Sequence, residues 1–210
     1  RPPRSTLFPY PTLFRSFSLK PGKPRMPGVH TFPDWDLKDL RQYIDWTPFF
    51  RAWELAGNYP AILEDEVVGE SATSLFADAQ KMLDKIIDEK WLTARGVAGL
   101  WTCRRKGDDI IVHVEDEKHY TLPMLRQQIA KREGRANMCL ADFIDPAGDW
   151  IGGFAVSIHG IEPHLARFKA AIDDYSDILL KALADRLAEA FAERDRKSTR
   201  LNPRHVLMSY

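Results

Sequence analysis

The chain has 210 residues, of which 44% are hydrophobic, so it is long enough for one well-buried core and too short for two comfortable domains. Its formal net charge is zero, but basic residues concentrate at the ends, and residues 34–193 carry 19 basic and 29 acidic side chains, a net charge of −10. An acidic central region argues against binding to a nucleic-acid backbone, and it favours a cationic ligand or a basic protein partner.

Cysteine usage and hydrophobic runs exclude further classes of protein. Cys103 and Cys139 form no CxxC motif, which indicates reduced thiols in the cytoplasm rather than a disulfide framework or a zinc knuckle. The apolar run near the N-terminus is interrupted by Pro9 and Pro11 and has no small-residue cleavage site, unlike a signal peptide. No stretch approaches the ~18 apolar residues that cross a bilayer, so we expect no membrane partner.

The first predicted elements are an arm and three helices. Residues 17–33 are rich in proline and glycine, which predicts an extended arm. Short helices are predicted at Leu37–Ile44 and Pro48–Leu55, with Pro48 at the first helical position. From Ser71 onwards the apolar residues recur at the spacing of a long amphipathic helix: Ala72, Leu75, Phe76, Ala79, Met82, Leu83, Ile86 and Ile87.

The spacing of the apolar residues then changes from that of a helix to that of extended strands. Gly96–Cys103 and Asp109–Glu115 are rich in Val, Ile and Trp, and they flank a polar segment at residues 104–108, which predicts a β-hairpin. Leu122–Lys131 is predicted to form a further helix. Met138–Ile144 and Trp150–Ile158 are predicted to pair as a second hairpin.

Helices are predicted again towards the C-terminus. Residues 162–172 predict one helix, and a longer one is predicted from Asp173, where acidic residues at the N-terminal end favour the helix dipole. The expected buried stripe of this helix is Tyr175, Leu179, Leu183, Leu187, Ala190 and Phe191. The order of elements predicts an α+β fold, a twisted antiparallel sheet with flanking helices, rather than a parallel βαβ series.

Familiar catalytic and cofactor motifs are missing from the sequence. It contains no GxGxxG or GxxxxGK[ST] motif for a nucleotide and no GxSxG elbow, and its histidines show no HxxxH spacing. We therefore predict no metal site and no catalytic residue in this chain. The absence of a visible nucleophile favours binding and docking over catalysis by the chain alone.

Two carboxylates lie beside dense apolar or aromatic sequence and are candidates for holding a positively charged small molecule. Asp45 precedes Thr47-Pro48, a position where a simple helix cap is far commoner than a ligand carboxylate, and the aromatic residues after it are more often core than cage. Glu189 is predicted on the flank of the apolar stripe, half desolvated, where a surface glutamate paired with Arg186 is the commoner alternative. Spacing alone favours the simpler alternative at both positions.

The two ends of the chain differ from the sequence between them. Residues 1–16 and 195–210 share no periodicity with their neighbours, and they resemble translated sequencing-adapter read-through. We expect these tails to encode no evolved structure, so that the domain occupies residues 17–194 and is incomplete on its C-terminal side. The alternative is a pair of ordinary basic tails.

Seven segments, in order and nearly at the spacing of one family, resemble the activation domain of cobalamin-dependent methionine synthase. The resemblance covers roughly residues 20–193 and is far more specific than any single motif. The segments are Tyr43–Phe50, Trp53–Pro60, Glu64–Gly69, Leu125–Gln128, Asn137–Phe143, Trp150–Val156 and Asp173–Glu193.

This resemblance implies a function for the intact enzyme and a role for four acidic residues. The activation domain binds S-adenosylmethionine and docks on the cobalamin-binding domain, where the methyl group rescues oxidised cobalamin while a flavodoxin or a flavin reductase supplies an electron. The aspartate of the family's DWTPFF segment and a glutamate of its last long helix hold S-adenosylmethionine, which implies this role for Asp45 and Glu189. Asp185 and Glu162 match positions that meet the histidine that cobalt releases during docking.

The sequence also departs from the family's pattern. It contains no RxxxGYP segment, whose arginine grips the ligand's carboxylate in the family, and none of the modules that bind folate, cobalamin, or homocysteine with zinc. The resemblance therefore implies a fragment of a methyltransferase of methionine biosynthesis that is inactive alone and binds S-adenosylmethionine weakly. The alternative is a free-standing module that docks on a separate corrinoid protein.

Overall fold

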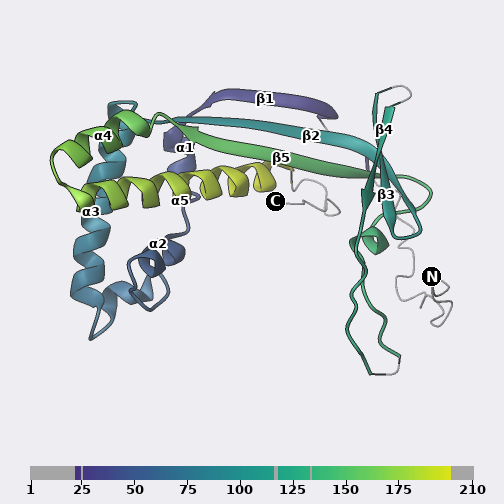
Figure 1. Cartoon of the computed structure of the whole chain (residues 1–210), viewed down its shortest axis with the longest axis horizontal. Helices are drawn as coiled ribbons and strands as arrows, with labels where there is room; N and C mark the ends of the chain where they lie inside the picture. Colours follow the sequence, from purple (N-terminus) through teal and green to yellow (C-terminus); the bar gives the residue numbers. More distant parts are fainter. Residues whose placement is uncertain (1–21, 25, 116–117, 133, 200–210) are drawn as a thin grey trace. The chain divides into compact units, whose positions relative to one another are not determined.

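A computed structural model of the chain describes residues 22–24, 26–115, 118–132 and 134–199 (Figure 1). The proposed tail 1–16 and most of the proposed tail 195–210 lie outside these residues. The contacts divide the chain into two compact units. We call His30–Ala98 with Phe154–Leu201 the helical unit, and the unit that contains Gly99–Gly153 the hairpin unit.

The sheet is antiparallel where its register is defined, and it confirms the predicted α+β class. The strand order is β1-β2-β3-β4, with β5 paired to β2, and β2 and β5 run through both units. Two antiparallel pairs, β2 with β3 and β3 with β4, form a meander in the hairpin unit. The strands are β1 (Gly28–Trp35), β2 (Thr93–Lys106), β3 (Asp109–Glu115), β4 (Lys118–Pro123) and β5 (Asp149–His159).

The first predicted hairpin is confirmed, with a tighter turn than expected. Lys106 pairs with Asp109, so the connection is the two-residue turn Gly107-Asp108. Gly107 has φ +64°, a left-handed conformation that a two-residue hairpin turn requires and that glycine adopts without steric cost. The strand therefore continues through residues 104–106, which were predicted to belong to the turn.

The predicted helices of the helical unit are confirmed, with small shifts of their ends. They are α1 (Leu37–Arg41), α2 (Trp46–Ala52), α3 (Gly69–Asp88), α4 (Glu162–Ala170) and α5 (Asp174–Thr199), with the 3-10 helix η1 (Ala61–Glu64) before α3. Pro48 is the third residue of α2 rather than the first, because Asp45 provides the cap. Within the described residues, no helix is long and apolar enough to span a membrane.

The core of the helical unit forms where α5 packs against α1, α2, α3 and α4. Five of the six residues of the predicted stripe on α5 are buried, but Tyr175 is 44% exposed. Tyr175 lies in the first turn of α5, where its ring meets Trp53 and its hydroxyl donates to Asp78 instead of entering the core. The core also includes Phe49 and Phe50 of α2, which are almost completely buried.

Two elements predicted in the hairpin unit are wrong. Leu122–Lys131 is not a helix, because Leu122 and Pro123 end β4 and the residues after them follow an irregular path. Leu125 and Ile129 are 86% and 59% exposed, so the apolar spacing in this segment does not reflect a buried helix face. Met138–Ile144 is not a strand either, since it contains the 3-10 helix η2 (Leu140–Phe143), and β5 pairs with β2 instead.

Both cysteines are free and buried in the hairpin unit, as predicted for reduced thiols. Desolvation, together with the nearby carboxylate of Asp149, raises the pKa of the Cys103 thiol to about 12. A thiol with so high a pKa is a packing group, because the thiolate is the reactive form.

Candidate ligand-binding site

Asp45 is the N-cap of α2, which confirms the simpler of the two roles considered for it. Its backbone is extended and its Oδ1 accepts a hydrogen bond from the amide of Thr47 at 3.0 Å. This bond satisfies one of the unpaired amides at the start of the helix and fixes the side-chain rotamer. Asp45 is exposed, and no described residue bonds to Oδ2, so one carboxylate oxygen can accept hydrogen bonds from a ligand.

Glu189 lies on the exposed side of α5, and its predicted environment is wrong in two respects. The residue is exposed rather than half desolvated. Arg186 was its predicted partner but forms an ion pair with Asp185, its neighbour in the chain. Among the described residues Glu189 has no ion-pair partner, so its charge can be neutralised by a cationic ligand.

The segment that contains Asp45 runs along α5 in the helical unit. The segment from Trp35 to Trp53 follows α5, since Asp39 bonds to Arg194 at 2.9 Å and Trp53 contacts Tyr175 with a ring separation of 5.2 Å. These contacts are 19 residues apart on α5, about 28 Å of helix.

Asp45 lies between these two contacts: the ring of Tyr43, two residues before it, is 5.8 Å from the Arg194 guanidinium, and the ring of Trp46, directly after it, meets Phe76 of α3 at 4.9 Å. Glu189 is five residues before Arg194, in the C-terminal half of α5.

The aromatic residues within α2 form core rather than a cage for a cation. Trp46, Phe49 and Phe50 are buried and meet one another edge to face. Their faces are covered by protein, so cation–π attraction to a bound ligand is not available to them. Their role is to hold α2, and with it Asp45, in place.

The two predicted docking residues lie on helices that pack against each other. Glu162 opens α4 and is exposed, and Asp185 is exposed on α5. Asp185 already neutralises Arg186, so a docking histidine would share this carboxylate with an arginine. All four predicted site residues therefore belong to the helical unit and reach its surface.

An open groove of about 480 Å³ lies at the N-terminal end of α5, and the sequence did not predict it. Trp53, Leu55 and Tyr175 line it together with the start of α3 at Glu70, Ser71, Ser74 and Leu75. Neither Asp45 nor Glu189 contributes to it, so it is separate from the predicted site. Only the fold brings Trp53 and Tyr175 together, because they are more than 120 residues apart in the chain.

Residues 36–203 match the family model described as "Vitamin B12 dependent methionine synthase, activation domain". The chain belongs to this family.

A solved member of the activation-domain family has the same fold. The crystal structure of the MetH reactivation domain bound to AdoHcy is 47% identical in sequence and superposes with a TM-score of 0.81 over 87% of this chain. The match covers 58% of that reactivation domain, so this chain spans a little over half the length of its solved relative.

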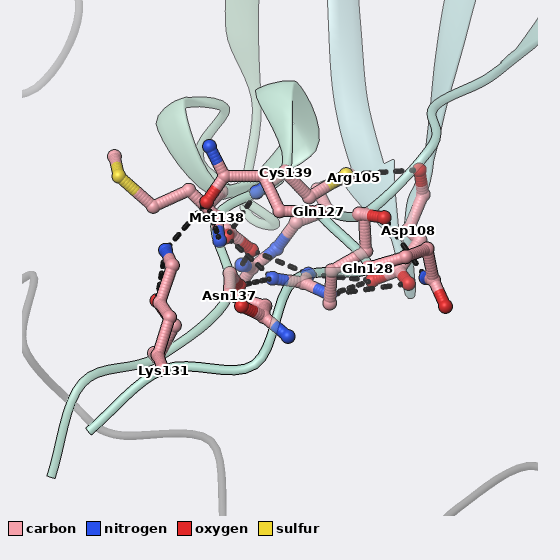
Figure 2. A network of polar contacts seen from close by, with 11 residues as sticks. Arg105, Asp108, Gln127, Gln128, Lys131, Asn137, Met138 and Cys139 are labelled. Carbon is pink, nitrogen blue, oxygen red and sulfur yellow. Dashed lines mark hydrogen bonds and ion pairs between the residues drawn. The ribbon is translucent and has the colours of Figure 1, made fainter. Parts of the chain in front are cut away.

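Two of the family segments, Leu125–Gln128 and Asn137–Phe143, are joined by Arg126, whose role was not predicted. Its guanidinium forms a bidentate pair with Asp142 at 2.7 and 2.8 Å, and it also bonds to Asp108 and to the carbonyl of Asn137. Figure 2 shows the surrounding network, in which the labelled Asp108 and Asn137 approach from separate segments. The hydrogen bonds that Arg126 donates to Asp142 and Asp108 raise its pKa, and the bond from Arg126 is the largest of the effects that lower the pKa of Asp142.

The network explains the irregular path of this activation-domain segment. Asp142 also accepts from the amide of Cys139, so it caps η2 while it holds Arg126. The hairpin turn at Asp108, the segment after β4 and η2 are thereby tied to one guanidinium. No local sequence pattern reports such a set of partners, because they are 16 and 18 residues from Arg126.

Proposed function

We propose that this activation-domain chain contributes to an S-adenosylmethionine site, in which Asp45 and Glu189 supply the carboxylates. The observation that supports this most directly is its 47% identity with a reactivation domain whose crystal structure contains AdoHcy. S-adenosylmethionine carries a sulfonium, an ammonium and two ribose hydroxyls, all of which a carboxylate can stabilise or bond.

The free oxygen of Asp45 is suited to this role because the bond from Thr47 already holds the side chain in one rotamer. A preorganised acceptor loses less entropy when a ligand binds. Glu189 has no competing cation among the described residues, so its charge remains available to the ligand's cationic groups.

In the intact enzyme, we propose, the domain serves a cytoplasmic methyltransferase of methionine biosynthesis whose other parts hold cobalamin and zinc. S-adenosylmethionine supplies the methyl group for reductive methylation of cobalamin and leaves as S-adenosylhomocysteine, and a flavodoxin or a flavin reductase supplies the electron. Asp185 and Glu162 receive the histidine of the cobalamin-binding domain. A histidine that gains a carboxylate partner is stabilised in its charged form, which favours the docked state.

A ligand titration followed by NMR tests the site. We expect weak binding of S-adenosylmethionine by this chain, below the reach of calorimetry in the micromolar range, and progressive shifts of the Thr47 and Glu189 amides at millimolar ligand. Asp45→Asn keeps the helix cap but removes the charge, so affinity should fall about tenfold, which corresponds to about 1.4 kcal/mol for a lost charge-assisted bond. Glu189→Gln should act in the same direction.

Matched controls are available within the chain. Asp36 caps α1 through the amide of Lys38, as Asp45 caps α2, so Asp36→Asn changes the same chemistry at another helix. Glu66 is exposed and serves as the control for Glu189. If the control substitutions weaken binding as much as Asp45→Asn and Glu189→Gln, or if the shifts lie elsewhere, the proposed site is wrong. Micromolar affinity of the unaltered chain would contradict the expectation of weak binding.

A further inference from the structure

The hairpin unit contains two histidines that face each other across β3 and β4. His113 of β3 is the direct antiparallel partner of His119 of β4, and the two ring centroids are 6.4 Å apart. Partners in such a pair project from the same face of the sheet. Figure 1 shows β3 and β4 side by side in this unit.

Both imidazoles are available for coordination. His113 and His119 are exposed, and neither ring has a hydrogen bond or an ion pair with another described residue. On its other side His113 faces Thr102 of β2, which is neutral, so no ion pair competes for the ring there. Arg104 lies two residues along β2 from Thr102, and Lys118 precedes His119 in β4 with its ammonium over the ring of Tyr120.

The separation of the rings suits one shared metal ion. A coordinated imidazole nitrogen lies about 2.0–2.1 Å from zinc, which places the ring centroid roughly 3.2 Å from the ion. Two rings that share an ion therefore have centroids between roughly 4.5 Å, for ligands at a right angle, and 6.4 Å, for opposed ligands. The observed 6.4 Å lies at the upper limit of this range, and rotations of roughly 10–15° about χ1 of each histidine bring the rings to the roughly 5.2 Å of a tetrahedral pair.

We propose that His113 and His119 form a bidentate site for a divalent transition-metal ion that links β3 to β4. Imidazole prefers Cu²⁺, Ni²⁺ and Zn²⁺ over hard cations such as Mg²⁺. Within the described residues no group of three or more His, Cys, Asp or Glu side chains is arranged around a metal, so water completes the coordination of this ion. The site is independent of the proposed S-adenosylmethionine site, which belongs to the helical unit.

Titration of the full chain with CuCl₂, ZnCl₂ and MgCl₂ tests the proposal, with NMR line broadening for Cu²⁺ and calorimetry for Zn²⁺. We expect one ion per chain, the order Cu²⁺ before Zn²⁺, no response to Mg²⁺, and effects centred on His113 and His119. His113→Asn and His119→Asn should each weaken binding on the order of a hundredfold, because the second imidazole binds in an intramolecular step. His159→Asn is the control, since His159 lies in the helical unit and bonds to Ser157.

Each outcome either supports or overturns the proposal of a shared metal ion. Equal loss in both single variants with an unchanged control supports a shared ion. Binding that survives the double substitution, that is lost equally in His159→Asn, or that Mg²⁺ reproduces overturns the proposal. Far-UV circular dichroism of each metal-free variant checks that it folds, and His119→Gln replaces any variant that does not.

Discussion

Replacing Arg126 with methionine should destabilise the hairpin unit by about 3 kcal/mol, because it leaves two carboxylates facing each other without their shared cation. Arg126 is 21% exposed and Asp142 14%, so this network is partly shielded from water. Methionine keeps a comparable apolar stem, so the change isolates the loss of the guanidinium.

The magnitude follows from the contacts that are lost. Removing one partner from a buried pair costs about 3–5 kcal/mol, and each hydrogen bond to a charged group contributes about 1.5–3 kcal/mol, although these terms are not additive. Two features reduce the cost: Asp108 is 38% exposed, and Arg105 remains 3.4 Å from Asp142. The lower end of the range is therefore expected.

The substitution should also change the acid dependence of stability. The pKa of Asp142 is lowered in the folded chain, mainly by the hydrogen bond from Arg126, so this group adds stability above its ordinary pKa of 3.8. That contribution is lost as pH falls through and below 3.8. Without Arg126 the pKa rises, and the difference between the two proteins should be larger at pH 7 than at pH 3.

Hydrogen exchange measures the stability of the hairpin unit separately from that of the helical unit. The amides of Ile110 and Val112 lie in β3, and their exchange under native conditions reports the opening free energy of the hairpin unit. Arg41→Met is the control, because Arg41 and Asp84 form an exposed pair for which the expected loss is below about 1 kcal/mol. The reasoning is refuted if Arg126→Met costs no more than Arg41→Met.

Two further predictions concern the helical unit. Ile172 has φ +55° and is 86% exposed, so Ile172→Gly should raise stability by about 1 kcal/mol in urea unfolding by removing a β-branched side chain from the left-handed region, whereas Ile172→Ala should change it little. Partial burial, aided by Arg167, lowers the pKa of His164, although Glu89 opposes this effect. The folded chain then binds this proton less readily than the unfolded chain, so stability should fall as pH drops below about 6.5, and His164→Gln should flatten that part of the pH profile measured by urea unfolding. An unchanged profile would show that another group causes the slope.

The sequence predicted the helices of this protein well because their signal is local. The stripe on α3 and most of the stripe on α5 follow directly from the spacing of apolar residues, which repeats within one element. Asp45 was likewise considered as a helix cap on the residues that follow it, and the cap is present.

Predictions failed where the deciding contacts join distant segments. The segment after Leu122 contains residues that favour helix, but Pro123 and the bonds of Arg126 to Asp108 and Asp142 hold it in an irregular path. The partner of Glu189 was also predicted wrongly, since Arg186 is neutralised by Asp185. These outcomes depend on three-dimensional proximity, to which a periodic pattern is insensitive.

The sequence by itself determined membership of the activation-domain family, the helices and the identity of the candidate carboxylates, because order and spacing along the chain record these properties. Only the tertiary structure decided which strand β5 joins, how Arg126 connects three segments, and that His113 faces His119. The physical reason is that strand pairing, ion pairs and desolvation depend on residues far apart in the chain, whose interaction energies exist only after the fold has brought them together.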